Sequence, residues 1–103
     1  MKFDRAFWHR VADTIAERGH CRNELTDENG AVCLAGAIHC VIHGDPFVHF
    51  EHRTEAVAAL ETVSKRLRLR GDASFAVYWN NEIAKDGQEV IDVLRKIAET
   101  AEF

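Results

Sequence analysis

Hydrophobic residues near the start of the chain recur at intervals of three and four positions. This spacing predicts an amphipathic helix over residues 3–18, with one apolar face. Asp4 suits the first turn, where the helix dipole favours a negative charge, and Gly19 is well placed to end the helix. The polar segment 20–30 that follows predicts a loop.

The segment 32–43 is apolar on nearly every side, and its only strongly polar side chains are His39 and His43. A helix that is hydrophobic all round belongs in the interior of a fold. We therefore expect an enclosed central helix that ends at Gly44. A glycine within a helix is unfavourable by about 1 kcal/mol relative to alanine. Gly36 is therefore expected to allow the first or last helix to approach closely.

A second long amphipathic helix is expected after a loop over residues 47–52, whose aromatic side chains should fill the core. Thr54 is the expected cap of this helix, and Gly71 is its expected end. Basic residues crowd its last turns, where the helix dipole favours cations.

Two further helices are expected in the last third of the chain. Residues 73–79 predict a short helix; a strand over 75–79 is the alternative, disfavoured because a lone strand would lack a partner. Asp86 and Glu89 resemble a capping box before the final helix. The expected fold is an all-α, compact bundle of four main helices with a buried central helix and one short extra helix, forming a single domain over 1–103.

Composition and charge narrow the classes of function. The chain has 103 residues, with a formal net charge of −4 and a hydrophobic share of 47%. The negative charge weakens general attraction to nucleic acid or an anionic membrane, and no apolar run is long enough to span a bilayer. Three cysteines without a secretory signal favour the cytoplasm and reduced thiols. An intermolecular disulfide through an exposed Cys21 is the alternative.

The histidines of the central segment raise the possibility of a metal site. His39 and His43 are four residues apart, so on a helix their imidazoles can share one zinc or iron ion. Cys40 and His49 are the nearest candidates to complete the ligand set, and Asp45 is close in sequence. These spacings match no established Cys/His zinc signature. The alternative is that both histidines are buried and donate to backbone carbonyls or water.

Catalysis has little support in the sequence. Cys33 is expected in the first turn of the central helix, where the dipole would lower its thiol pKa. His39 lies on a different helical face and is a poor base for it. No nucleophile elbow, phosphate-binding loop or dinucleotide-binding glycine pattern is present. We expect no catalytic residue and no organic cofactor.

Basic residues over 65–70, Arg66 and Arg70 among them, could contact phosphates. The run lacks the interleaved aromatic residues of single-strand binders, and no helix-turn-helix pair is evident. Nucleic-acid binding through this run is therefore a minor alternative.

Tyr78, Trp79 and Asn80 have two interpretations. An exposed Tyr-Trp pair could anchor a binding partner. Alternatively, the indole is buried beneath a turn whose asparagine amides cap neighbouring backbone groups.

The chain resembles a family of small helical domains of unknown function found in actinobacteria and their phages. The likeness covers most of the chain and lies in the segment Gly30–Ile38, the run Trp79-Asn80-Asn81 and the closing helix from Glu89. The family has an acid where Asn81 stands and an aromatic where His20 stands. The resemblance supports the helical fold and transfers no function.

These observations favour a small non-enzymatic accessory protein that acts as a protein–protein binding module. It would be phage-encoded, as the resemblance implies, and could act as a homodimer or with another protein. Metal binding is the alternative from a different class of function.

Overall fold

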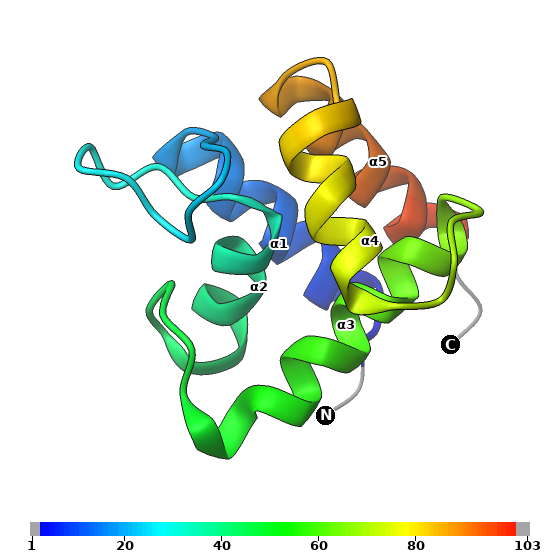
Figure 1. The fold of residues 1–103 in the computed structure, drawn as a ribbon, viewed down its shortest axis with the longest axis horizontal. Helices are drawn as coiled ribbons and strands as arrows, with labels where there is room; N and C mark the ends of the chain where they lie inside the picture. The colour runs from blue at the N-terminus through cyan, green and yellow to red at the C-terminus, as the bar shows by residue number, and fades with distance from the viewer. Residues whose placement is uncertain (1–2, 101–103) are drawn as a thin grey trace.

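Helices account for all regular structure longer than an isolated bridge in residues 3–100, the part of the chain that this computed structural model describes (Figure 1). A 3₁₀ turn leads into the third α-helix, and a π-helical turn extends the fourth. The elements are α1 (Arg5–Arg18), α2 (Leu34–His43), η1 (Phe50–His52), α3 (Arg53–Arg66), α4 (Ala73–Tyr78), η2 (Trp79–Ile83) and α5 (Gly87–Thr100). The all-α prediction, with four longer helices and one short one, is confirmed.

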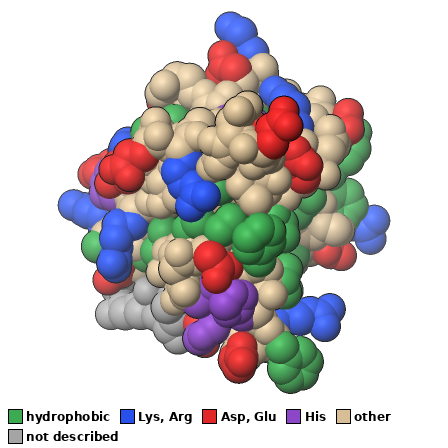
Figure 2. Space-filling view, turned by 90° about the vertical axis from the view of Figure 1, so that its left-hand side faces the viewer, with side chains coloured by type: hydrophobic (Ala, Val, Ile, Leu, Met, Phe, Trp, Pro, Cys, Tyr) green, Lys and Arg blue, Asp and Glu red, His purple; other side chains and the backbone are tan. Residues whose placement is uncertain are grey.

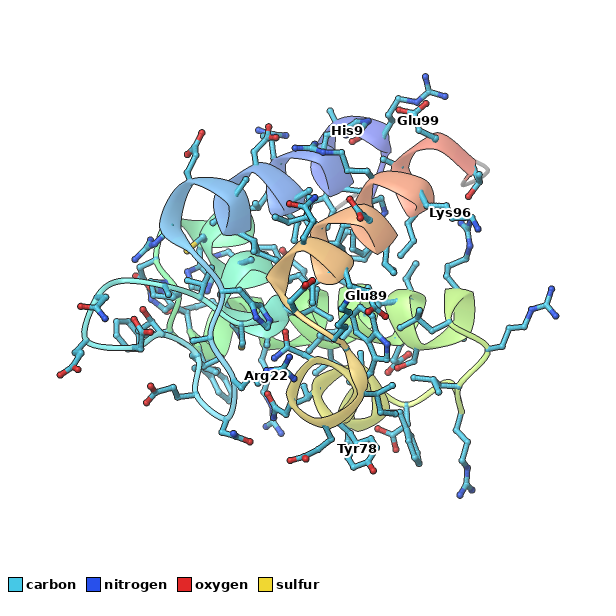
Figure 3. The ribbon with its side chains drawn as sticks, turned by 90° about the horizontal axis from the view of Figure 1, so that it is seen from above. His9, Arg22, Tyr78, Glu89, Lys96 and Glu99 are labelled. Atoms are coloured by element: carbon cyan, nitrogen blue, oxygen red, sulfur yellow. The ribbon has the colours of Figure 1, made fainter. Side chains whose placement is uncertain are left out.

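Helix α1 begins and ends at the residues that its sequence marks. Asp4 is the N-cap rather than part of the first turn, and its side chain accepts a hydrogen bond from Phe7 N at 2.9 Å. Gly19 ends the helix with a φ of 91°, a conformation that favours glycine. Helix α1 lies alongside α5, and a hydrogen bond of 2.8 Å between His9 Nε2 and Glu99 Oε1 joins their exposed faces (Figure 3).

The core forms where the apolar faces of α1, α2, α3 and α5 meet. Trp8, Ile15, Leu34, Ile38 and Leu94 are among its largest fully buried side chains. The enclosed position expected for the central helix is confirmed for the first six residues of α2, whereas its last four are partly exposed.

Helix α2 begins two residues later than predicted. Val32 is fully buried but lies outside the helix, in isolated bridges to two other loop residues. Cys33 is the N-cap, and its Sγ accepts a hydrogen bond from Gly36 N at 3.3 Å. A thiol acting as a cap was not anticipated, because serine, threonine, aspartate and asparagine are the usual capping residues.

The prediction that Gly36 allows the first or last helix to approach α2 closely is wrong. A Cβ at this position would lie 2.1 Å from the backbone oxygen of Leu25, which belongs to the loop between α1 and α2. The close approach is therefore between a helix and a loop, rather than between two helices. The loop backbone reaches this position because Leu25 O also accepts a hydrogen bond from Cys33 N at 3.2 Å.

The segment between α2 and α3 differs from its prediction. The side chains of Phe47 and Phe50 are 56% and 88% exposed, so they do not fill the core. Helix α3 starts at Arg53 rather than after a Thr54 cap, and His52, the N-cap residue, makes no side-chain capping bond. The preceding 3₁₀ turn supplies carbonyl acceptors instead, since Arg53 N donates to Phe50 O.

Helix α3 ends at Arg66, well before Gly71. Arg68 has a φ of 60°, so the chain leaves the helix direction there. Leu67 and Leu69 could not both face the core from one straight helix, and the early end allows both to pack partly against it.

The segment after α4 remains helical beyond residue 79, where the predicted short helix ends. Residues 73–78 form the predicted helix rather than the alternative strand, and η2 continues the helix through Asn80 and Asn81. The start of α5 was predicted correctly: Asp86 Oδ1 accepts a hydrogen bond from Glu89 N at 2.9 Å. Glu89 Oε2 in turn accepts one from Lys85 N at 3.0 Å.

Candidate functional site

Four histidines gather where α2 ends and α3 begins. His43 lies at the centre of this histidine cluster, which consists of His39, His43, His49 and His52. Its ring centroid is 5.2 Å from that of His39, 3.8 Å from that of His49 and 5.3 Å from that of His52. Figure 2 shows histidine side chains in one patch of the surface, beside a band of hydrophobic side chains.

Local turns bring the cluster together. Helical spacing places His39 and His43 on the same face of α2. Gly44 then ends the helix in the left-handed conformation, and Asp45 Oδ1 accepts a hydrogen bond from Phe47 N at 2.9 Å. This tight turn directs the chain back on itself. As a result, His49 Nε2 lies 2.8 Å from Asp45 Oδ2.

The two ring nitrogens of His43 face different groups. Its Nε2 lies 3.2 Å from His39 Nδ1, within hydrogen-bonding distance. Its Nδ1 lies 3.8 Å from Asp45 Oδ1, and this buried atom has no hydrogen-bond partner in the described part of the chain. If Nε2 carries the proton and donates it to His39, Nδ1 presents a free lone pair toward Asp45.

Three side chains in and beside the cluster lie close enough together that they could hold a metal ion. His43, Asp45 and His49 each offer one ligand atom, and the three atoms lie within 4.8 Å of one another. Four-coordinate zinc with bonds of 2.0–2.2 Å holds its ligand atoms about 3.4 Å apart, so small side-chain rotations would suffice. The side chain of His43 is 3% exposed, whereas those of Asp45 and His49 are 42% and 39% exposed. A fourth ligand position would therefore open to solvent.

The electrostatics of the cluster favour the neutral forms of His39 and His43. Burial lowers the pKa of His39 and of His43, and the neighbouring imidazoles lower both further. The pKa of Asp45 is also lowered, chiefly by the hydrogen bond from Phe47 N and then by the charge of His49. These directions favour an uncharged His43 and an ionised Asp45, the protonation states in which those two side chains bind metal.

The predicted metal ligands are divided between two places. His43 and His49 belong to the three-residue group, and His39 lies behind His43 as its hydrogen-bond partner. Cys40 is directed elsewhere: its Sγ accepts a hydrogen bond from Arg18 Nη1 at 3.4 Å. The physical reason is the packing of α1 against α2, which brings Arg18 to the Cys40 thiol. As a member of this ligand group, Cys40 was predicted wrongly.

The interpretation of Trp79 and Asn80 as an exposed binding surface is wrong, because Trp79 is only 5% exposed and Asn80 only 1%. Asn80 Oδ1 accepts hydrogen bonds from Leu34 N at 3.1 Å and from His20 Nε2 at 2.7 Å. Asn80 Nδ2 donates to Cys21 O at 3.3 Å. The alternative, a buried indole followed by an amide that satisfies neighbouring backbone groups, is confirmed.

The other surface candidates remain exposed. Tyr78 is 54% exposed and points away from the body of the protein (Figure 3). Arg66 Nη2 donates a hydrogen bond to Thr100 Oγ1, and the guanidinium of Arg70 lies 5.7 Å from the centroid of the Phe75 ring. Nucleic-acid binding through these arginines stays a prediction.

Arg22 has an important structural role for which the sequence contains no signal. From the loop after α1, its guanidinium reaches the end of the π-helical turn (Figure 3). There it donates to the backbone carbonyls of Asn80, Asn81, Ala84 and Lys85, at 2.7 to 3.2 Å. An arginine in a polar loop is ordinarily solvated, so only the folded structure identifies this role.

Comparisons with known proteins place the chain in a family. No helix among residues 3–100 combines the length and apolar character that crossing a membrane requires. No curated protein and no solved structure matches the chain. A sequence model of a family of unknown function, DUF6197, matches residues 4–100. The expected resemblance to an uncharacterised family is thereby confirmed, and the chain belongs to the family of unknown function DUF6197.

Proposed function

We propose that the protein binds a divalent transition metal ion, zinc in the first instance, through His43, Asp45 and His49. The observation that carries this proposal is the approach of their three ligand atoms to within 4.8 Å of one another. Two imidazoles and one carboxylate suit zinc better than the hard cations calcium and magnesium, which prefer oxygen ligands.

The two ring nitrogens of His43 support this assignment. Its Nδ1 is buried without a hydrogen-bond partner in the described residues, and the metal would use that lone pair. Its Nε2–H would donate to His39 Nδ1 at 3.2 Å, as metal-bound histidines usually donate their second nitrogen to a neighbouring group. His39 would therefore orient His43, and solvent would fill the fourth position.

Zinc titration of chelator-treated protein by isothermal calorimetry tests the proposal. We expect one zinc ion per chain. His43→Gln and His49→Gln should each weaken binding by about 100-fold or more, whereas His39→Gln should weaken it by about 10-fold to 100-fold. The matched control is His9→Gln, since His9 pairs with Glu99 outside the cluster and should leave zinc affinity unchanged.

Three results would contradict the assignment. The first is wild-type protein that does not bind zinc at micromolar concentrations. The second is an affinity that is unchanged in His43→Gln and His49→Gln. The third is loss of binding in His39→Gln with His49→Gln unaffected, which would assign the metal to the His39–His43 pair.

A second candidate is the predicted protein–protein binding module, supported by exposed apolar side chains next to the histidine cluster. Phe47, Val48 and Phe50 are 56%, 55% and 88% exposed within one short segment. Exposed apolar groups in one patch are typical of interaction sites.

We propose that this segment binds a second copy of the chain or one other protein, and that the protein is a cytoplasmic, phage-encoded accessory protein. The free thiols of the three cysteines and the resemblance to domains from actinobacteria and their phages support this setting.

Light scattering across a range of protein concentrations tests self-association. A dimer of the wild type should become a monomer in Phe50→Ser. Ile83→Ser, which replaces a 52% exposed residue outside this segment, should leave the dimer intact. A wild-type monomer, or equal effects of the two substitutions, would contradict self-association through this segment.

A further inference from the structure

A groove of about 210 Å³ opens beside the histidine cluster, between α2, α3 and the two loops that flank α2. Two polar residues, His39 and Arg53, line it. The rest of its wall is apolar and consists of Leu25, Ala35, Val48, Ala56, Val57 and Leu60. Figure 2 shows a band of hydrophobic side chains beside the histidine patch.

The charge in the groove is unbalanced. Arg53, the first residue of α3, is exposed and makes no hydrogen bond or ion pair through its guanidinium with another residue in the range 3–100. Among residues 3–100, no acidic side chain lines the groove. A guanidinium beside apolar walls, with no carboxylate opposite, is complementary to an anionic group on a ligand.

His39 supplies a second donor. Its Nδ1 faces His43 Nε2 at 3.2 Å. When His43 donates this hydrogen bond, a neutral His39 carries its own proton on Nε2. That Nε2–H has no partner in the described part of the chain, and the His39 ring lines the groove. Arg53 and His39 therefore offer donors at the same groove.

We propose that this groove binds a small organic acid with a branched or short apolar tail. The carboxylate would pair with Arg53 and accept a hydrogen bond from His39 Nε2–H, while the tail would contact Val57 and Leu60. The volume sets the size of the ligand: 210 Å³ is below the range of about 300–1,000 Å³ that is typical of drug-sized ligands. A ligand of fewer than about ten heavy atoms is therefore expected. Binding in the groove does not require a metal ion at His43.

The probes are 4-methylpentanoate and its neutral counterpart 4-methylpentanamide, which have nearly the same shape. Each is titrated into ¹⁵N-labelled protein in the presence of a chelator, and amide chemical shifts are followed by NMR. We expect saturable shifts at groove residues for the acid. The amide should bind at least about tenfold more weakly, because a charge-assisted hydrogen bond is lost.

Variants test the role of each part of the groove. Arg53→Gln should reduce the affinity for the acid to that for the amide. Arg70→Gln is the matched control, because that guanidinium lies over the Phe75 ring and does not line the groove. Val57→Phe should fill the groove and weaken both probes, with a thermal melt to confirm that the variant is folded.

Several results would overturn the proposal: equal affinities for acid and amide, unchanged binding in Arg53→Gln, or shifts confined to another face. Absence of shifts up to about 10 mM of the acid would do the same, because that limit corresponds to negligible affinity. Since the chelator removes metal, the outcome does not depend on whether the histidine cluster binds zinc.

Discussion

Replacing Asn80 with alanine is expected to destabilise the protein by about 4 kcal/mol, through lost hydrogen bonds. The Asn80 side chain makes four of them. Its Oδ1 accepts from Leu34 N at 3.1 Å and from His20 Nε2 at 2.7 Å. Its Nδ2 donates to Cys21 O at 3.3 Å and to Asn81 Oδ1 at 2.9 Å. The residue is 1% exposed, so water cannot easily replace these partners.

The magnitude follows from the burial of each partner. The backbone groups of Leu34 and Cys21 would be left without the amide in the interior, which costs about 1.5 kcal/mol each. The side chains of His20 and Asn81 are nearer the surface and can turn to water, so their loss costs about 0.5 kcal/mol each. The total is a large part of the 5–15 kcal/mol that stabilises a typical domain.

Urea unfolding followed by circular dichroism measures this loss, provided that the slope of free energy against urea is unchanged. Asn80→Leu separates hydrogen bonding from volume: it fills the space but restores no hydrogen bond, so it should be no more stable than Asn80→Ala. Asn29→Ala, at an exposed loop position, is the control and should change stability by less than about 0.5 kcal/mol. A loss below about 1 kcal/mol in Asn80→Ala, or recovery in Asn80→Leu, would refute the reasoning.

Three further predictions concern packing, pH and thiol reactivity. Gly36→Ala should lower the free energy of unfolding by about 2 kcal/mol or more in urea, because its Cβ would lie 2.1 Å from Leu25 O; unchanged stability would contradict this close approach. Stability in a chelator should be constant above about pH 6.5 and fall below it, because the lowered pKa values of His39 and His43 let the unfolded chain take up protons first. Thermal melts from pH 7.5 to 5 measure this, and His39→Gln/His43→Gln should weaken the trend. Ellman's reagent should label the partly exposed Cys40 in native protein and the other two cysteines only after unfolding; burial raises the pKa of one of them, Cys21, to about 11.

The elements predicted well are those whose ends depend on neighbouring residues. Asp4 and Asp86 have side chains that cap the backbone a few positions later, and the interactions are local. Gly19 and Gly44 adopt backbone conformations that favour glycine. Such signals are contained in a few consecutive residues, so the sequence alone is sufficient to identify them.

The elements predicted poorly depend on contacts between distant parts of the chain. Helix α3 ends before Gly71 because Arg68 adopts a left-handed conformation, although its residue type does not favour one. The π-helical turn continues through Asn80, and three of the four partners of its side chain lie between positions 20 and 34. Arg22 satisfies the carbonyls at the end of that turn from about sixty positions away. No local pattern reports such pairings.

The candidate site combines both cases. The spacing of His39 and His43 correctly predicted that the two rings would meet, because helical periodicity determines that contact. Periodicity does not exclude Cys40, which lies three residues before His43; its exclusion depends on the contact with Arg18, from a distant part of the chain. The approach of His49 to Asp45 depends instead on the turn at Phe47, which a short aromatic-rich segment does not specify. The roles that we propose for the histidines change as a result. Because the loop brings Asp45 and His49 beside His43, we assign the metal to these three residues and give His39 the role of orienting His43.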